Sequence, residues 1–403
     1  MRSVLSLCFL LLLLTACSEY NSISDRDGDG AHDQLDLFPD DASKAFSLTG
    51  EISDVRGSVT LVLNDQRLIV NTGGTFRFDI PYGEAFKLQA ESSLADELCL
   101  ISSPEHDATT AIEAITISCI ERTDINLALN SIVSDYLRLC IEEQDAIWVD
   151  EITELDCKVE IIDSADGIEE FVFLNKLALR LVEEISTSDS KIRSIDLSKN
   201  RRLEEIDIVV SDIDISGLDR LRKLHLSGYE GVEIDLFNHN SLTNLFIIAY
   251  DLERIEVNHL TNLEEFAVLS RKLETLEVSN LDKLRVLAVS ASEMEDIDVT
   301  KNENLLSLGI IYSPISTLNI SNNKKLNFLM LLDCMVVAMD VSNNINIMTL
   351  ILSSNKLEMV PVGIRSIKNK LAEINLNYNP FTENAKAELE LLKQEYENLT
   401  FDE

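Results

Sequence analysis

The chain has 403 residues, of which 45% are hydrophobic, and its formal net charge is −37 at pH 7. A chain of this length and composition buries a substantial core, so it is not disordered, and it has room for roughly two or three domains. The 71 acidic residues against 34 basic ones repel phosphate groups, which argues against nucleic acid and acidic lipid headgroups as ligands. Cations, basic proteins and neutral glycans stay open as partners.

The amino-terminal segment, residues 1–16, combines one arginine with an apolar run from Val4 to Leu14. This pattern predicts an export signal, because the run is too short to cross a bilayer as a folded helix. The four residues that end at Cys17, LTAC, resemble the lipobox of bacterial lipoproteins. The resemblance implies that Cys17 is acylated and anchors the chain to a membrane, and Ser18 behind it favours the outer membrane. Which side of that membrane the chain faces stays open.

Export also places the chain in an oxidising compartment, where disulfides form. Of the seven cysteines, Cys8 belongs to the signal and Cys17 to the anchor. Sequence order pairs four of the others, Cys99 with Cys119 and Cys140 with Cys157. The last one, Cys334, lies in the apolar stretch LNFLMLLDCMVVAMDV, and we expect it to be a buried thiol.

An acidic linker covers residues 17–46. Its run SDRDGDGAHDQLDLFPDD places carboxylates at alternate positions of a calcium loop, and Gly30 permits the sharp turn there. No helical pattern flanks the loop, so it is not an EF-hand, and with FPD included the run resembles one thrombospondin type 3 repeat. That resemblance implies that calcium is bound by Asp25, Asp27, Asp29, Asp33 and Asp36, with the carbonyl of Ala31. We expect the ion to stiffen the tether, and the alternative is a solvated acidic linker.

Between residues 47 and 122, apolar residues alternate with polar ones, as in SVTLVLND and GGTFRFDI. A period of two between Gly, Asn and Asp turns predicts a small antiparallel β-sandwich. The runs GSVTLVLN and GGTFRF and the closing cysteine pair resemble the short immunoglobulin-like modules of bacterial envelope lipoproteins. This resemblance implies a spacer, and the segment has no aromatic cluster that would indicate a glycan site.

The pattern LxxLxL begins at Leu221 and returns every 21 residues until Ile347. A fixed period in this range indicates a solenoid whose units bury their apolar faces against their neighbours. Runs such as IDVTKN and LNISNN resemble the short bacterial class of leucine-rich repeat, which implies an α/β solenoid with a parallel sheet over residues 161–380. Helical caps are expected at residues 123–160, stapled by Cys140 and Cys157, and at residues 381–403.

In this family the third, fifth and seventh residues of each repeat face the concave side of the sheet. Eleven of these 21 positions in seven repeats are apolar here, a larger apolar patch than a soluble monomer normally exposes. Large apolar groups near the centre of an interface dominate its affinity. We therefore predict that a protein partner is bound by Phe246, Ile248, Leu269, Ile311, Phe328, Met330, Leu332 and Ile351. The alternative is an envelope scaffold in which this face is buried between copies of the chain.

The other half of each repeat carries an acidic stripe, which indicates a solvated face. Its members are Glu233, Asp235, Glu256, Glu277, Asp296, Asp298 and Asp340. The five histidines have no metal-ligand spacing, and no nucleophile can be matched with a nearby base, so no enzyme is predicted. The whole sequence predicts a lipid-anchored cell-envelope protein that binds another protein.

Overall fold

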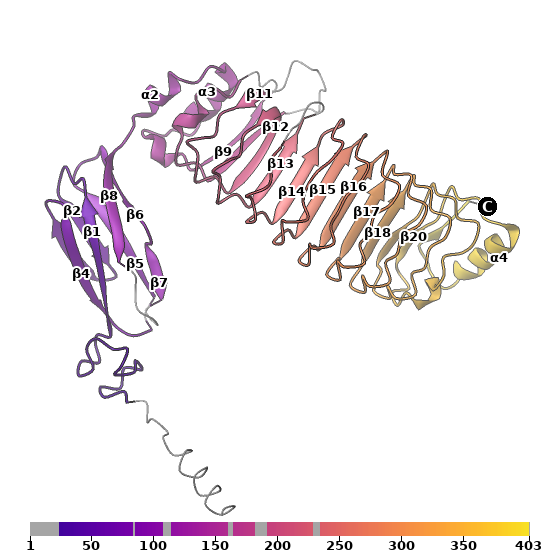
Figure 1. Cartoon of the computed structure of the whole chain (residues 1–403), viewed down its shortest axis with the longest axis horizontal. Helices are drawn as coiled ribbons and strands as arrows, with labels where there is room; N and C mark the ends of the chain where they lie inside the picture. Colours follow the sequence, from indigo (N-terminus) through magenta and orange to yellow (C-terminus); the bar gives the residue numbers. More distant parts are fainter. Residues whose placement is uncertain are drawn as a thin grey trace, which may run out of the picture. The chain divides into compact units, whose positions relative to one another are not determined.

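A computed structural model describes residues 24–83, 85–107, 114–159, 164–181, 192–228 and 234–402 (Figure 1). The expected export signal and Cys17 lie outside these residues. The chain divides into two compact units, Met1–Arg122 and Thr123–Glu403. Within the described ranges, no helix is both long enough and apolar enough to span a bilayer.

The first unit is built from two four-stranded sheets, ordered β4-β1-β8-β6 and β3-β2-β5-β7. The strands are β1 Phe46–Ser53, β2 Val59–Leu63, β3 Gln66–Val70, β4 Gly74–Ile80, β5 Ala85–Ser92, β6 Glu97–Ile101, β7 Glu105–Asp107 and β8 Ile115–Glu121. Alternate residues of both sheets point into one hydrophobic core, as the period of two predicts. The expected sandwich is therefore present. It is not wholly antiparallel, because its first and last strands, β1 and β8, form a parallel pair.

Cys99 of β6 lies opposite Cys119 of β8, and the two form a disulfide. The pairing predicted from sequence order is confirmed here. A second confirmed disulfide joins Cys140 to Cys157 in the second unit.

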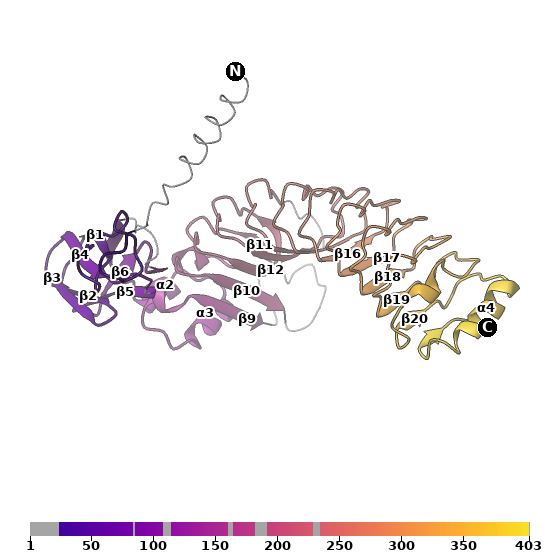
Figure 2. The ribbon, with the colours of Figure 1, turned by 90° about the horizontal axis from the view of Figure 1, so that it is seen from below.

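The second unit is a solenoid with one 13-stranded parallel sheet along its length (Figures 1 and 2). Its strands are β9 Glu154–Val159, β10 Lys176–Leu181, β11 Ile192–Ile195, β12 Glu205–Ile213, β13 Lys223–Ser227, β14 Asn244–Ile248, β15 Glu265–Ser270, β16 Val286–Ala291, β17 Ser307–Ile311, β18 Phe328–Leu332, β19 Thr349–Ile351, β20 Glu373–Asn375 and β21 Leu399–Thr400. From β14 to β18, residues 21 apart are direct partners, as Leu245, Phe266 and Leu287 are. The predicted repeat is confirmed as one turn of the coil.

Buried asparagines hold successive turns of the coil together. Asn302, Asn323 and Asn344 have no exposed surface, and each donates its amide N–H groups to backbone oxygens of the preceding turn. The Nδ2 atom of Asn323, for example, lies 2.9 Å from the oxygens of both Val299 and Asn302. These oxygens also accept a backbone N–H of their own turn, from Asn302 at 3.0 Å and from Leu305 at 3.1 Å, so the side chain adds the hydrogen bonds that join one turn to the next.

Both ends of the solenoid core are covered. At the start, α2 Ile125–Leu129, α3 Asp135–Glu142 and a 3-10 helix at Val149–Glu151 precede the sheet, and the disulfide from Cys140 ties α3 to β9. The segment expected to be wholly a cap thus already contains the first strand, because Leu155 and Cys157 are buried in the sheet. At the other end, α4 Glu383–Leu392 is shorter than the expected cap helix and is followed by β21.

Candidate functional site

All eight predicted partner-binding residues lie in neighbouring rows on the concave side of the sheet. One row contains Phe246, Ala267, Ala288, Gly309, Met330 and Ile351 in direct register. The row beside it contains Ile248, Leu269, Ser290, Ile311 and Leu332. Phe328 belongs to the third row, at the other end of the same strand as Leu332. Phe246 is 38% exposed and the other seven are half-buried, so the rows form one continuous apolar surface.

The middle of this apolar surface carries only small side chains. Between Phe246 and Met330 the central row holds only Ala267, Ala288 and Gly309, and the space above Gly309 is open to at least 4 Å. Neighbouring strands lie about 4.8 Å apart. The larger side chains therefore border a shallow apolar depression several strands wide, a shape that accepts protruding apolar groups.

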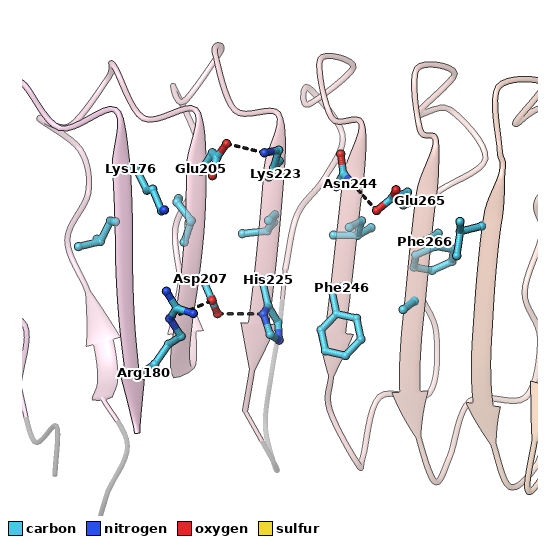
Figure 3. A pocket seen from close by; sticks show the side chains of 16 residues that line it. Lys176, Arg180, Glu205, Asp207, Lys223, His225, Asn244, Phe246, Glu265 and Phe266 are labelled. Atoms are coloured by element: carbon cyan, nitrogen blue, oxygen red, sulfur yellow. Dashed lines mark hydrogen bonds and ion pairs between the residues drawn. The ribbon is translucent and has the colours of Figure 1, made fainter. Parts of the chain in front are cut away.

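The concave side also has a charged end that the apolar pattern did not reveal. A hollow of about 380 Å³ lies over β10 to β16, beside the apolar surface (Figure 3). Its charged and polar lining residues are Lys176, Arg180, Glu205, Asp207, Lys223, His225, Asn244 and Glu265. These residues occupy the same rows as the apolar ones, so the repeat positions that identified the apolar residues in the sequence could also have identified them.

Acidic side chains on one strand contact basic side chains on the neighbouring strands in this hollow. Glu205 contacts the ammonium group of Lys223 at 2.6 Å, and Asp207 contacts Nδ1 of His225 at 2.9 Å and Nε of Arg180 at 3.4 Å. The imidazole of His225 meets the ring of Phe246 edge-on, with the ring centroids 4.3 Å apart. The charged and apolar parts of the concave side therefore adjoin each other, and their side chains are held in place by mutual contacts.

Asp207, His225 and Ser227 superficially resemble a catalytic relay, because Nε2 of His225 lies 3.4 Å from the hydroxyl of Ser227. Acyl transfer also needs N–H donors that stabilise an oxyanion. The strand residue Ser227 is in the ladder with β12 and β14, and the N–H of Gly228 already donates to the oxygen of Ile248 at 2.9 Å. The N–H of Gly228 is therefore not free to stabilise an oxyanion.

The acidic loop of the first unit brings together part of the predicted calcium set. Oxygens of Asp25, Asp27 and Asp29 lie within 4.8 Å of one another. Asp36 is only 7% exposed, and an Oδ2 atom of each of Asp27, Asp29 and Asp36 is buried without a hydrogen-bond partner. Burial raises the pKa of Asp36, and the nearby charges of Asp29, Asp27 and Asp33 add to that rise. A cation would relieve these unpaired oxygens.

Asp33 has other partners in this structure. Its carboxylate accepts the N–H of Arg26 at 2.8 Å, and hydrogen bonds from Ser24 and Arg26 lower its pKa. The loop also differs from a flexible linker, because Ala31 is buried in the hydrophobic core of the sandwich and Gly30 packs against the ring of Tyr82. No single residue type in the sequence indicated that the acidic loop packs against the sandwich.

Three described aspartates of the acidic stripe have local partners. Asp235, Asp298 and Asp340 accept the N–H of the residue two positions later, at 2.9, 2.8 and 2.8 Å. Hydrogen bonds from the hydroxyl and then the N–H of Thr300 lower the pKa of Asp298. These carboxylates stabilise tight turns, and Glu233 lies outside the described residues.

Cys334 is a buried thiol, as predicted. Its sulfur lies 3.5 Å from the oxygens of Ile310 and Leu332, and burial raises its pKa. In the next repeat, Asn355 fills the same place and donates to Leu331 O at 2.7 Å. The thiol thus substitutes for a turn-closing asparagine.

Known proteins resemble this chain in structure and not in sequence. No protein-family model and no curated protein matches the sequence. An internalin from Listeria monocytogenes is similar to this chain at 19% identity and a TM-score of 0.50, over 69% of this chain and 88% of that one. The solenoid has the leucine-rich repeat fold. A leucine-rich repeat protein from Leptospira interrogans also matches, at 14% identity and a TM-score of 0.35, over 70% of this chain and 98% of that one. At these identities the likeness extends to the fold alone.

Proposed function

We propose that this chain is a lipid-anchored outer-membrane protein that binds a protein partner through the concave side of its repeat solenoid. The observation that carries the proposal is the ordered apolar surface from Phe246 to Ile351, which joins a hollow lined by paired charges. Interfaces between proteins combine such an apolar centre with a polar margin. The acyl anchor at Cys17 rests on the LTAC run alone.

The partner surface would place apolar side chains in the depression over Gly309 and polar groups over Lys176. The ammonium group of Lys176 lines the hollow and has no ion-pair partner among the residues that the structure describes, whereas Lys223 is paired with Glu205. An acidic or carbonyl group of the partner would complete its hydrogen bonds. This arrangement favours a protein partner over a glycan, since the described central row between Phe246 and Met330 consists of Ala267, Ala288 and Gly309 and offers no ring for a sugar to stack on.

Substitution of the apolar centre tests this proposal. The variant Phe328→Asp/Met330→Asp should lose the partner that the parent chain captures from detergent-solubilised envelopes, because two charges would be buried without partners. The variant Met348→Asp/Met359→Asp is the matched control, since these methionines are 59% and 60% exposed and lie outside the concave rows. Equal capture by the parent and the first variant would contradict the proposal.

Self-association is the alternative use of the same surface. Sedimentation equilibrium on the chain from residue 18 onward, which lacks the acyl anchor, distinguishes the two. A monomer at micromolar concentration supports a separate partner. A dimer that Phe328→Asp/Met330→Asp dissociates would overturn it in favour of a scaffold.

We also propose that the acidic loop binds one calcium ion, held by Asp25, Asp27, Asp29 and Asp36. The unpaired buried oxygens of Asp27, Asp29 and Asp36 support this assignment, and hard oxygen ligands suit calcium. Because Ala31 of the loop is buried in the sandwich core, the ion should brace the sandwich as well as the tether.

Thermal unfolding with and without calcium tests this site. Calcium at 100 times its dissociation constant should stabilise the first unit by about 2.7 kcal/mol, which raises its unfolding temperature. The variant Asp27→Asn/Asp29→Asn should lose the effect, and Asp40→Asn/Asp41→Asn is the control with the same change in charge. An unfolding curve of the parent that calcium does not move would contradict the site.

A further inference from the structure

Charges are sorted between the two edges of the solenoid. We define the leading turns as the six residues before each strand from β12 to β20. We define the returning segments as residues 249–258, 271–279, 292–300, 312–321, 333–342 and 352–366, which follow β14 to β19. All the strands are parallel, so every leading turn lies at the edge where the strands begin, at the tails of the arrows in Figure 3.

The leading turns contain twelve basic and five acidic residues. The basic ones are Lys199, Arg201, Arg202, Arg220, Arg222, Lys283, Arg285, Lys301, Lys324, Lys325, Lys368 and Lys370, and the acidic ones are Glu204, Asp219, Glu264, Asp282 and Glu303. The returning segments show the reverse, with twelve acidic and five basic residues. A chain with a net charge of −37 therefore has one basic edge.

Several of these basic groups are not neutralised by the fold. Lys199 pairs with Glu170 at 2.7 Å and Arg285 with Glu264 at 3.6 Å. The side chains of Arg201, Arg220 and Arg222, however, have no ion-pair partner among the described residues. Arg202 stacks on the ring of Phe173, 4.7 Å from its centroid, and burial together with the nearby charge of Arg220 lowers its pKa. Arg202 and Arg220 are thus close enough for their like charges to interact, and Glu204 and Asp219 line the same hollow as Arg220 and Arg222.

We propose that the leading-turn edge of the solenoid lies against the anionic headgroups of a phospholipid bilayer. Nine turns spaced about 4.8 Å apart make an edge roughly 40 Å long. Six of the nine, those before β12, β13, β16, β17, β18 and β20, carry Lys or Arg, and cations spread along one edge can meet phosphates that lie in a plane. A second copy would have to bring its acidic returning segments against this edge, so sedimentation of the chain without vesicles distinguishes self-association from binding to a bilayer. The choice of a bilayer as the binding surface rests on the proposed anchor at Cys17. The presence of the basic edge does not depend on whether the concave side binds a partner.

The whole-chain charge does not prevent this contact. From β13 to β18, strands of five or six residues, roughly 17–20 Å long, separate the leading turns from the returning segments. At physiological ionic strength the Debye length is about 8 Å. The bilayer therefore meets mainly the edge nearest to it, and the sequence argument against acidic headgroups, which used the net charge, does not apply to this edge.

Vesicle sedimentation tests the proposal on the chain from residue 18 onward, made without acylation. At physiological ionic strength it should bind vesicles of equal parts phosphatidylglycerol and phosphatidylcholine and should not bind pure phosphatidylcholine. The variant Arg201→Gln/Arg220→Gln/Arg222→Gln should partition roughly a hundredfold less, since each basic residue near an anionic surface contributes several-fold. The control Arg254→Gln/Lys272→Gln/Lys356→Gln removes the same charge from the returning segments and should bind like the parent.

Three outcomes would overturn the proposal. The first is no binding of the parent to anionic vesicles, and the second is an equal loss in both variants, which would indicate net charge alone. The third is parent binding to inorganic polyphosphate or duplex DNA as strong as to the vesicles, which would assign the edge to soluble polyanions. Because the concave residues are unchanged in both variants, partner capture by them tests the proposed function separately.

Discussion

Removal of the Cys140–Cys157 disulfide should destabilise the solenoid by about 3 kcal/mol, the value expected for a loop of about this length. The bond closes a segment with a sequence separation of 17 and ties α3 to the first strand of the sheet. The variant Cys140→Ala/Cys157→Ala isolates this effect. Trp148, the one tryptophan of the chain, lies between the two cysteines, so its fluorescence in urea reports the unfolding of this end of the solenoid.

The other disulfide provides the control for this measurement. Cys99 and Cys119 belong to the first compact unit, and Trp148 belongs to the second. The variant Cys99→Ala/Cys119→Ala should therefore leave the Trp148 midpoint unchanged, although it weakens the sandwich. A shift of the Trp148 transition as large as that in the first variant would show that the units do not unfold independently.

The second large effect is expected at the buried asparagines. Asn323→Ala should destabilise the solenoid by about 1–3 kcal/mol, because the oxygens of Val299 and Asn302 each lose one of their two hydrogen bonds, at about 0.5–1.5 kcal/mol per bond. Urea titration followed by far-ultraviolet circular dichroism measures the loss.

The adjacent Asn322 is the matched control for this substitution. It is exposed and makes one side-chain bond, to the oxygen of Thr300 at 3.0 Å. Asn322→Ala should change the stability by less than about 1 kcal/mol. If the two variants were equally stable, the buried asparagines would not be what joins the turns.

The repeat could be read from the sequence because its physical requirement is local and recurs. Each turn must bury the same positions, so the leucines such as Leu263 and Leu284 mark the coil without any knowledge of distant contacts. The concave rows followed directly, since residues at the same position in successive repeats must lie side by side. The eight predicted residues accordingly share one surface.

The charged end of the concave side was not predicted, although it lies in the same rows. Glu205 and Lys223 are 18 residues apart because that turn is shorter, so their pairing follows from the strand register and not from the common period. The sequence analysis also selected only apolar residues at the outward-facing repeat positions, so it left out the charged residues there. The basic edge was missed for a related reason, because net charge averages over surfaces that the coil separates.

The acidic loop shows a third limit. Alternating aspartates indicated a cation site, and Asp25, Asp27 and Asp29 do converge. Ala31, however, gives no sequence signal that it belongs to the core of the next module. Contacts made by one small residue depend on the tertiary fold and not on a pattern.

Site-specific photocrosslinking in intact cells tests most directly whether the concave side binds a partner. A photoreactive residue at Met330 in the apolar row should give one discrete adduct, which mass spectrometry identifies as a different protein. The same residue at Met359, which is 60% exposed outside the concave rows, should give none. Adducts of equal yield from both positions, or an adduct at Met330 only with the chain itself, would contradict the account.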